Sequence, residues 1–310
     1  MKNNYKYIKA GTVLGAILLL SGCGGGGGSS AAVTQTTFTN WNSISKPTQV
    51  NLEGIATDVS YVTDAGVTKI TSVTDHGVDS TATANVTYRA DSTISHLKFT
   101  TNNGTVSFDE NGTDTIADLG NVVYAYDAAG TKFVIASDPL HSSNNWNYQT
   151  FGIWETGRGT GSGTAGAVSV GSATLGSSIP TSGTATYSGH FGGAASDVNG
   201  VDKITSGSVS VGANFGTRSL AFATSNSKYI SPILSSSPSW TSKSALDMTG
   251  TLTYSAATNA FSGSVSDSFA GTGTVNGKFY GPNAEEMGGV FSLKTADTTK
   301  FHAGGFGAKK

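Results

Sequence analysis

Apolar and polar residues alternate one by one along several stretches in the second half of the chain. In residues 184–191, TATYSGHF, the apolar positions Ala185, Tyr187 and Phe191 alternate with Thr, Ser and His. Residues that alternate in this way point to opposite faces of a β-strand. The same alternation recurs in SVSVGANF, GTLTYS, FSGSVSD and TVNGKFYG. No helical amphipathic pattern of comparable length is present, so the chain is predicted to be all-β.

The alternating stretches add up to eight strands over residues 146–310. The count includes the segment around Leu220 and Phe222, YQTFGIWE before it and GGVFSL near the end. Eight antiparallel strands with one apolar and one polar face form a closed barrel or a sandwich. The hairpin signal Asn199-Gly200 and the glycines within strands favour a barrel. The polar face is Ser, Thr, Asn and Lys without aromatic girdles, which favours a soluble barrel over a membrane-spanning one.

Shorter strand-like stretches fill the first half of the chain. Examples are VSYVT, TATANVTYR, ISHLKFT and NVVYAYD, and YDAAGTKF has the form of a hairpin. Residues 23–145 contain 5 basic and 12 acidic residues, whereas residues 146–310 contain 10 basic and 8 acidic residues. We therefore predict a small acidic β-rich domain over 38–145, followed by the eight-stranded barrel over 146–310.

The N-terminus has the features of a secretory signal. Three lysines precede the apolar run AGTVLGAILLL, which is too short to span a bilayer, and the small residues SGC follow it. The segment LSGC resembles the bacterial lipobox, which implies a signal peptide over 1–22, cleavage before Cys23 and diacylation of its thiol, with palmitate as an expected acyl chain of the anchor. The alternative is an ordinary signal peptide with a cysteine nearby. Cys23 is the single cysteine of the chain, so it has no disulfide partner.

A Gly/Ser-rich tether is predicted over residues 23–37, because GGGGGSSAAVTQTT has no apolar pattern. As a random coil it would hold the folded part on the order of 20 Å from the bilayer. Removal of residues 1–22 takes away three of the 18 basic residues, which leaves 15 basic and 20 acidic residues, a net charge of −5. Such a chain has no nucleic-acid footprint.

Two connections between predicted strands are long. Residues 156–182 are rich in Gly, Ser and Ala and are expected to be mobile, and residues 226–244 contain two prolines. The second connection also carries large apolar residues, which indicate a contact surface for a partner. The alternative is a loop that folds over the barrel mouth and packs its own apolar residues. The candidate partner-binding residues are Tyr229, Ile230, Ile233, Leu234 and Trp240.

The adjacent carboxylates Glu285 and Glu286 are the first candidates for acid–base chemistry. They lie in GPNAEEMGG, where AEEM fits a single helical turn between two strands. Adjacent residues on such a turn do not face each other, and a glycosidase needs two carboxylates about 5–10 Å apart across one bond. The pair is therefore interpreted as part of a structural connection, and no catalytic residues are expected.

Histidines and aspartates offer weaker candidates. The five histidines show no HxH or HExxH spacing, so no metal site is predicted. His190, on the polar face of its strand, is either a solvated side chain or a haem ligand on the barrel exterior. The stretch Asp109 to Asp114, DENGTD, is either a polar turn or a fragment of a calcium loop.

Several motifs together resemble the transferrin-binding protein B β-barrel family. They are LSGCGGGGGSS, WNYQTFGIWETG, PTSGTATYSGHFGG, VSVGANFG and GKFYGPNAEEMGGVFSL, with FHAGGFGAKK at the C-terminus. The resemblance covers about residues 146–310, and the 38–145 domain corresponds in position to the family's handle domain. The resemblance implies a surface lipoprotein of a Gram-negative bacterium whose barrel binds a host protein, haem or a haem carrier. The chain has room for one handle-plus-barrel unit.

These observations lead to a functional expectation. The protein is expected to be a non-catalytic, monomeric binding module, lipid-anchored in the outer membrane through Cys23 and facing outward. Its expected partner is a host protein or haem carrier. No cofactor is expected, although haem stays a possible ligand. The alternative is a structural or adhesive surface lipoprotein without a role in nutrient capture.

Overall fold

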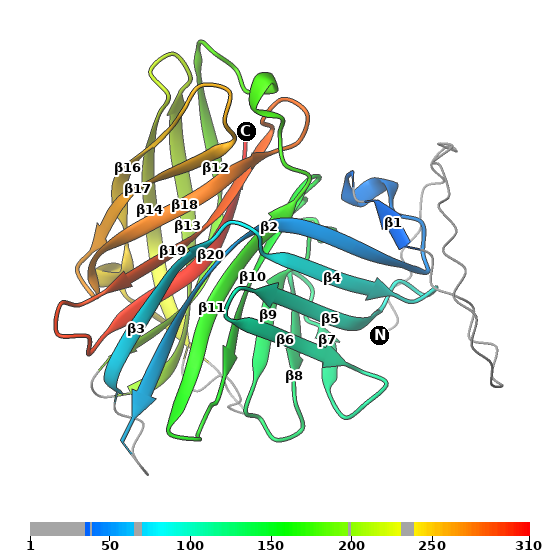
Figure 1. The fold of residues 1–310 in the computed structure, drawn as a ribbon, viewed down its shortest axis with the longest axis vertical. Helices are drawn as coiled ribbons and strands as arrows, with labels where there is room; N and C mark the ends of the chain where they lie inside the picture. Colours follow the sequence, from blue (N-terminus) through cyan, green and yellow to red (C-terminus); the bar gives the residue numbers. More distant parts are fainter. Residues whose placement is uncertain (1–34, 38, 65–69, 198–199, 231–238) are drawn as a thin grey trace.

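The computed structural model describes residues 35–37, 39–64, 70–197, 200–230 and 239–310 (Figure 1). The described part is all-β, as predicted, with three short 3-10 turns at Trp41–Ser43 (η1), Gly176–Ser178 (η2) and Ser244–Leu246 (η3). No helix in the described ranges is long and apolar enough to cross a membrane. Cys23 lies outside the described residues.

Eleven strands form the first sheet, which takes up the N-terminal half of the chain. Its order is β6-β5-β4-β2-β11-β10-β9-β8-β7, and β1 and β3 pair with the long central strand β2. All pairings are antiparallel except the one between β1 and β2. The strands are β1 Gln35–Thr37, β2 Thr48–Thr63, β3 Ile70–Asp79, β4 Thr83–Tyr88, β5 Ile94–Thr101, β6 Gly104–Asp109, β7 Thr115–Asp118, β8 Val122–Tyr126, β9 Phe133–Ser137, β10 Gln149–Thr156 and β11 Ser162–Gly171.

Eight antiparallel strands close into a barrel in the C-terminal half. Their order is β13-β12-β20-β19-β18-β17-β16-β14, and β14 pairs back to β13. A ninth, short strand, β15, pairs with the end of β14 outside the ring. The eight-stranded antiparallel barrel predicted from the alternation is thus confirmed. The strands are β12 Thr184–Asp197, β13 Gly200–Asn214, β14 Ser219–Ile230, β15 Trp240–Ser242, β16 Thr249–Tyr254, β17 Ala260–Asp267, β18 Gly271–Tyr280, β19 Glu286–Lys294 and β20 Phe301–Lys309.

The set of barrel strands differs from the predicted one in one member. The stretch YQTFGIWE is β10 and pairs with β9 and β11 in the first sheet, so its assignment to the barrel was wrong. The eighth barrel strand is β20, FHAGGFGAK. Glycines occupy both faces of β20, so its alternation is hidden. Residues 156–182, expected to be a mobile connection, contain β11, which lies between β2 and β10. The change from one sheet to the other therefore falls between β11 and β12.

The barrel interior is filled with aromatic and aliphatic side chains. Phe191 meets Phe291 edge to face, and Phe279 is surrounded by the rings of Tyr187, Tyr254 and Phe261. The outward positions of β16 and β17 are mainly Thr and Ser and are exposed. One face of each strand is therefore buried and the other polar, which is the pattern expected of a filled small barrel.

The barrel packs against the first sheet through β19 and β20, which contact β2, β10 and β11 (Figure 1). Glycines make this close approach possible. A Cβ atom at Gly288 would lie 2.7 Å from Ser169 Oγ, and one at Gly307 would lie 2.2 Å from Gln149 Nε2. A cluster of buried apolar side chains extends the contact to β13 and β14. It comprises Ile55, Tyr124, Phe133, Ile153, Ala167, Ile204, Ile230 and Val290.

Candidate functional site

Three of the five predicted partner-binding residues, Tyr229, Ile230 and Trp240, lie on the paired strands β14 and β15 of the barrel sheet. Tyr229 and Ile230 are the last two residues of β14, and Trp240 opens β15. The two strands pair antiparallel, with Ile230 opposite Trp240 and Tyr229 opposite Thr241. The ends of the predicted 226–244 connection are therefore strands rather than loop. Ile233 and Leu234 lie outside the described residues.

Ile230 differs from its neighbours because it is buried. It is 9% exposed and belongs to the apolar cluster between the barrel and the first sheet. The expectation that its side chain is exposed to a partner was wrong. The physical reason is that the first sheet covers this part of the barrel, which the local sequence does not reveal.

Trp240 is exposed and stands among lysines. It is 46% exposed, and the Lys228 ammonium lies 4.9 Å from its ring centroid. On the adjacent strand β13, Lys203 lies 5.4 Å from the ring of the half-buried Tyr229 on β14. Lys243 follows β15 and is exposed. We call this surface, formed by Lys203, Lys228, Tyr229, Trp240 and Lys243, the aromatic–lysine edge.

A shallow cavity of about 40 Å³ opens beside this edge. The backbone N–H of Lys243 donates to the Ser227 carbonyl at 2.7 Å, which ties the end of β15 to β14. The edge is thus held on strands, with the exposed ring of Trp240 next to the Lys228 ammonium and the ring of Tyr229 next to the Lys203 ammonium. The cavity is lined by Ala195, Lys203, Tyr229, Lys243, Leu246 and Phe269.

The carboxylates Glu285 and Glu286 have separate structural roles. No helical turn forms here, and Glu286 is the first residue of β19. It is 2% exposed, and its carboxylate accepts the backbone N–H groups of Asn147, Tyr148 and Gln149 at 2.6, 3.0 and 3.1 Å. Burial raises the pKa of the Glu286 carboxyl, although the three backbone donors act in the opposite direction. Glu285 instead accepts from the backbone and side chain of Asn283. The interpretation of the segment as a structural connection agrees with this geometry.

His190 is covered by the first sheet rather than solvated. Its ring lies 5.3 Å from the rings of both Trp146 and Phe151, and its Nε2 is 3.4 Å from Ser137 Oγ. Burial lowers the pKa of the imidazole to about 4. One ring nitrogen is engaged and two aromatic rings flank the imidazole, so a contact between the two sheets explains this residue without a ligand.

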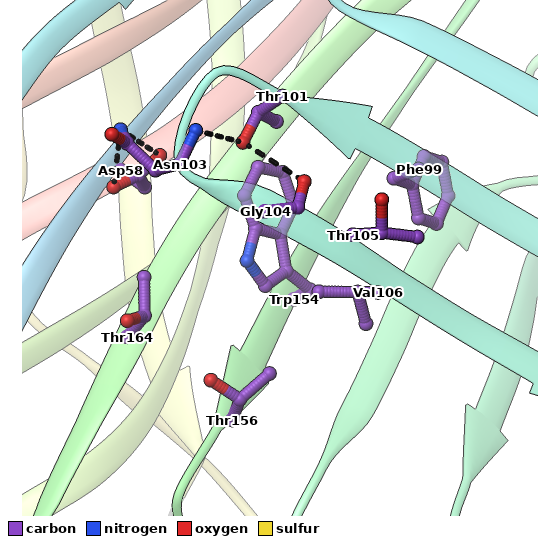
Figure 2. A pocket seen from close by; sticks show the side chains of 10 residues that line it. All are labelled: Asp58, Phe99, Thr101, Asn103, Gly104, Thr105, Val106, Trp154, Thr156 and Thr164. Atoms are coloured by element: carbon purple, nitrogen blue, oxygen red, sulfur yellow. Dashed lines mark hydrogen bonds between the residues drawn. The ribbon is translucent and has the colours of Figure 1, made fainter.

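The first sheet holds a cavity of about 120 Å³ that the sequence analysis missed (Figure 2). It lies below the tip of the β5–β6 hairpin, between that hairpin and β2, β10 and β11. Trp154 lies across Gly166 of the neighbouring strand and forms the apolar wall with Phe99 and Val106. We call this space the hairpin cavity. It is lined by Asp58, Phe99, Thr101, Asn103, Gly104, Thr105, Val106, Trp154, Thr156 and Thr164.

Asp58 is the one charged residue that lines the hairpin cavity. It is 2% exposed. Its carboxylate accepts hydrogen bonds from Asn103 Nδ2 at 3.3 and 3.1 Å and is in contact with Nδ1 of His76. His76 Nε2 in turn lies 3.3 Å from Ser60 Oγ. The sequence does contain a signal for this site. Asp58 and Ser60 lie on the same face of β2 as the buried Leu52 and Ala56, so two polar residues continue an apolar face of the strand.

The order hydroxyl, imidazole, carboxylate is also that of a hydrolytic relay. Such a relay needs backbone donors for the oxyanion close to its serine. Ser60 pairs with Thr74 on one side and Thr164 on the other, so the amides around it belong to the two ladders. The network therefore serves to orient Asp58. Within the described ranges, no group of three His, Cys, Asp or Glu residues is placed to hold a metal ion.

Comparison with known proteins supports the fold assignment. Residues 179–310 match the family model described as the C-lobe and N-lobe β-barrels of transferrin-binding protein B, which confirms the resemblance over the barrel. No curated protein matches the sequence.

Solved structures with a similar chain path include three transferrin-binding proteins B. A mutant from Haemophilus parasuis has 12% identity and a TM-score of 0.40, with 84% of this chain and 76% of that chain covered. A mutant from Actinobacillus pleuropneumoniae has 14% identity and a TM-score of 0.41, with 82% and 99% covered. The protein from serogroup B Neisseria meningitidis has 16% identity and a TM-score of 0.38, with 75% and 52% covered.

Proposed function

We propose that the protein is an outward-facing, lipid-anchored binding protein of the outer membrane that captures a host protein at the aromatic–lysine edge without catalysis. The match of the barrel to the transferrin-binding protein B family model supports a role in binding. The observation that carries the location of the site is the exposed Trp240 with the Lys228 ammonium against its ring. A haem carrier is one class of host protein that this function includes.

Covering the exposed part of the Trp240 ring with a partner would be favourable. Burying apolar surface contributes about 25 cal/mol per Å², and Trp and Tyr commonly dominate the energy of protein interfaces. Lys228 places a positive charge next to the Trp240 ring, and Lys243 adds an exposed one just after β15. The edge therefore fits an acidic protein surface that presents a pocket for an indole, with the ammonium groups raising the association rate.

The anchor is the second part of the proposal. The lipobox-like segment ends at Cys23, where the predicted tether over 23–37 begins; its last three residues are not tether, because Gln35–Thr37 form β1 and pair with β2. Acylation at more than one position would make anchoring stable. Replacing Cys23 with Ala should move the protein from the detergent phase to the aqueous phase, and equal membrane retention of this variant would contradict the anchor.

A pull-down with host serum and haemoglobin tests the proposed binding. The bait is the chain with Cys23→Ala, and its matched variants are Trp240→Ala and, as a control, Leu175→Ala. Leu175 is also an exposed apolar side chain, 72% exposed, but it lies in the β11–β12 connection. The expected result is a host protein that the bait and the control retain and the Trp240 variant loses by thirty-fold or more in affinity, corresponding to about 2 kcal/mol or more.

Two other outcomes decide against parts of the proposal. A partner that binds equally to the Trp240 variant would move the site away from the aromatic–lysine edge. If no host protein is retained by any bait, the capture function is wrong, and the structural or adhesive alternative takes its place.

A further inference from the structure

Among the residues that the structure describes, no Lys or Arg is paired with the buried carboxylate of the hairpin cavity. Asp58 is 2% exposed, and a buried carboxylate is costly unless it is paired. Its ion-pair contact in the described ranges is His76, which carries a charge when protonated, and Asn103 is neutral. None of the ten residues that line the cavity is basic. We propose that the hairpin cavity binds a primary ammonium or guanidinium group.

The carboxylate keeps room for another donor. Oδ1 of Asp58 receives Asn103 and faces His76, whereas Oδ2 receives Asn103 alone at 3.1 Å. Each carboxylate oxygen can accept about two hydrogen bonds. Oδ2 therefore has an acceptor position left within the described part of the chain. A cationic donor is the partner that also compensates the charge.

The remaining walls suit the rest of a cationic side chain. Three threonines on the cavity face of their strands, Thr101, Thr156 and Thr164, carry hydroxyls that can accept further N–H groups of an ammonium or guanidinium ion, whereas the Thr105 hydroxyl is paired with that of Thr100. Phe99, Trp154 and Val106 offer apolar surface to the methylene stem, and an aromatic ring also attracts a cation. The walls thus combine a carboxylate, hydroxyls and aromatic carbon around one small space.

The size and charge of the cavity limit the ligand. A volume of about 120 Å³ corresponds to roughly four water molecules, at about 30 Å³ each. This space accommodates a charged group and the methylenes next to it, but not a haem or a nucleotide. The acidic excess of residues 23–145, with 12 acidic and 5 basic residues, attracts cations and disfavours anions.

The tip of the β5–β6 hairpin forms one wall of the cavity. This tip, Thr101 to Gly104, lies over the cavity, and Asn103 at the tip donates to both oxygens of Asp58 (Figure 2). Entry of a cation would place it beside the Asn103 amide, so the resonances of this hairpin report on binding. The site lies on the first sheet and is independent of the aromatic–lysine edge on the barrel.

Titration of the Cys23→Ala chain by NMR tests this site. The probes are Nα-acetyl-lysine methylamide, Nα-acetyl-arginine methylamide and the neutral Nα-acetyl-norleucine methylamide. Shifts of the Asn103 side-chain amide and the Trp154 indole are followed. The lysine or arginine probe should shift both groups in a saturable manner and bind at least ten-fold more tightly than the norleucine probe, and added salt should weaken its binding.

Three variants connect the binding to Asp58 and to the cavity. Asp58→Asn should lower the affinity for the cationic probe ten-fold or more. Thr156→Leu keeps the charge but fills the space, and it should also abolish the shifts. Glu53→Gln removes an exposed carboxylate from the same strand and should change the affinity less than two-fold. Equal binding of lysine and norleucine probes, or probe shifts that persist in Thr156→Leu, would overturn the proposal, as would the absence of any shift.

A second arm of the titration identifies the source of the cation. Cadaverine presents the same ammonium group on a free diamine. Tighter binding of the capped lysine or arginine indicates a side chain of a partner protein, whereas tighter binding of cadaverine indicates a free small amine. Because the Trp240→Ala variant keeps the cavity intact, its affinity for these probes should be unchanged, which separates this site from the proposed host-protein site.

Discussion

Glu286 is a single side chain that connects the barrel to the first sheet. Its carboxylate receives three consecutive backbone N–H groups, from 147–149, just before and at the start of β10. These groups are about 140 residues away in sequence, so no local pattern distinguishes the buried Glu286 from the half-buried Glu285. The sequence could predict that the pair is not catalytic, but it could not predict which carboxylate is buried.

Replacing Glu286 with Gln should destabilise the protein by about 2 kcal/mol, because the amide NH₂ cannot accept and leaves a buried backbone N–H unsatisfied. The free energy of unfolding is measured by urea denaturation at pH 7. It is derived from the shift of the transition midpoint, with the dependence of the free energy on urea concentration held constant. Glu285→Gln is the matched control and should change the free energy of unfolding by less than about 0.5 kcal/mol. Equal effects of the two substitutions would contradict the role assigned to Glu286.

His190 should make the stability depend on pH. Burial lowers its folded-state pKa to about 4, below the ordinary value of 6.5, so the unfolded chain binds the proton more readily. Its contribution therefore favours folding fully above pH 6.5 and is lost as the pH falls from 6.5 towards 4. The loss amounts to at most about 3 kcal/mol.

The free energy of unfolding of the native chain and of a His190→Gln variant, measured between pH 7 and pH 4.5, tests this expectation. The difference between the two should shrink or reverse as the pH falls, because Gln does not titrate. Parallel pH profiles would show that His190 is solvated, as one reading of the sequence had it.

At the level of strands, aromatic side chains lie over glycines on the neighbouring strand. Phe261 faces Gly277, Phe191 faces Gly207 and Trp154 faces Gly166, each as a direct cross-strand pair. A Cβ atom at Gly277 would lie 2.2 Å from the Phe261 ring. The glycines are thus part of the core, because the absence of a side chain at each one leaves room for the ring on the neighbouring strand.

This arrangement explains which strands the sequence predicted and which it did not. Strands with a large apolar residue at every second position, such as β13 and β16, were recognised from alternation. In β20, Gly305 and Gly307 face the first sheet while Gly304 lies under Phe291, so no polar–apolar alternation is visible. The pairing of β10 with β9 rather than with the barrel depends on contacts between strands, which a single strand's pattern does not encode.

Gly277→Ala should lower the stability by about 1–3 kcal/mol, because the added methyl group overpacks a rigid ring in a filled barrel. Gly212→Ala is the matched control: it lies on β13, and its nearest neighbour is an alanine methyl 3.9 Å away from the new Cβ. That substitution should be neutral or slightly stabilising. Thermal unfolding of both variants, compared with the native chain, would contradict the explanation if their melting temperatures fell equally.

At the scale of the whole molecule, the question is which residues of the two sheets stabilise the fold and which are available to bind a partner. The sequence predicted the class, the barrel and the apolar character of the 226–244 segment. It could not predict the hairpin cavity, which brings together residues from 58, 99–106 and 154–164. It also could not show that one side of β14 is covered, because the cover comes from strands more than sixty residues earlier in the chain.

Ile230 and Trp240 should therefore have opposite effects when truncated, although they are cross-strand partners. Ile230 is packed in the cluster between the sheets, so Ile230→Ala leaves a cavity and should cost about 2–4 kcal/mol of stability. Trp240 is exposed, so Trp240→Ala should change the stability by less than about 0.5 kcal/mol while it weakens host-protein binding. Both quantities are measured on the Cys23→Ala chain, stability by urea unfolding and affinity by titration with the host protein recovered in the pull-down.

Below the unfolding transition, Ile230→Ala should bind nearly as well as the native chain, since its side chain faces the first sheet rather than the partner. If Trp240→Ala lowered the stability and left the affinity unchanged, the β14–β15 hairpin would be a lid on the barrel, and the host-protein site would have to lie on another surface.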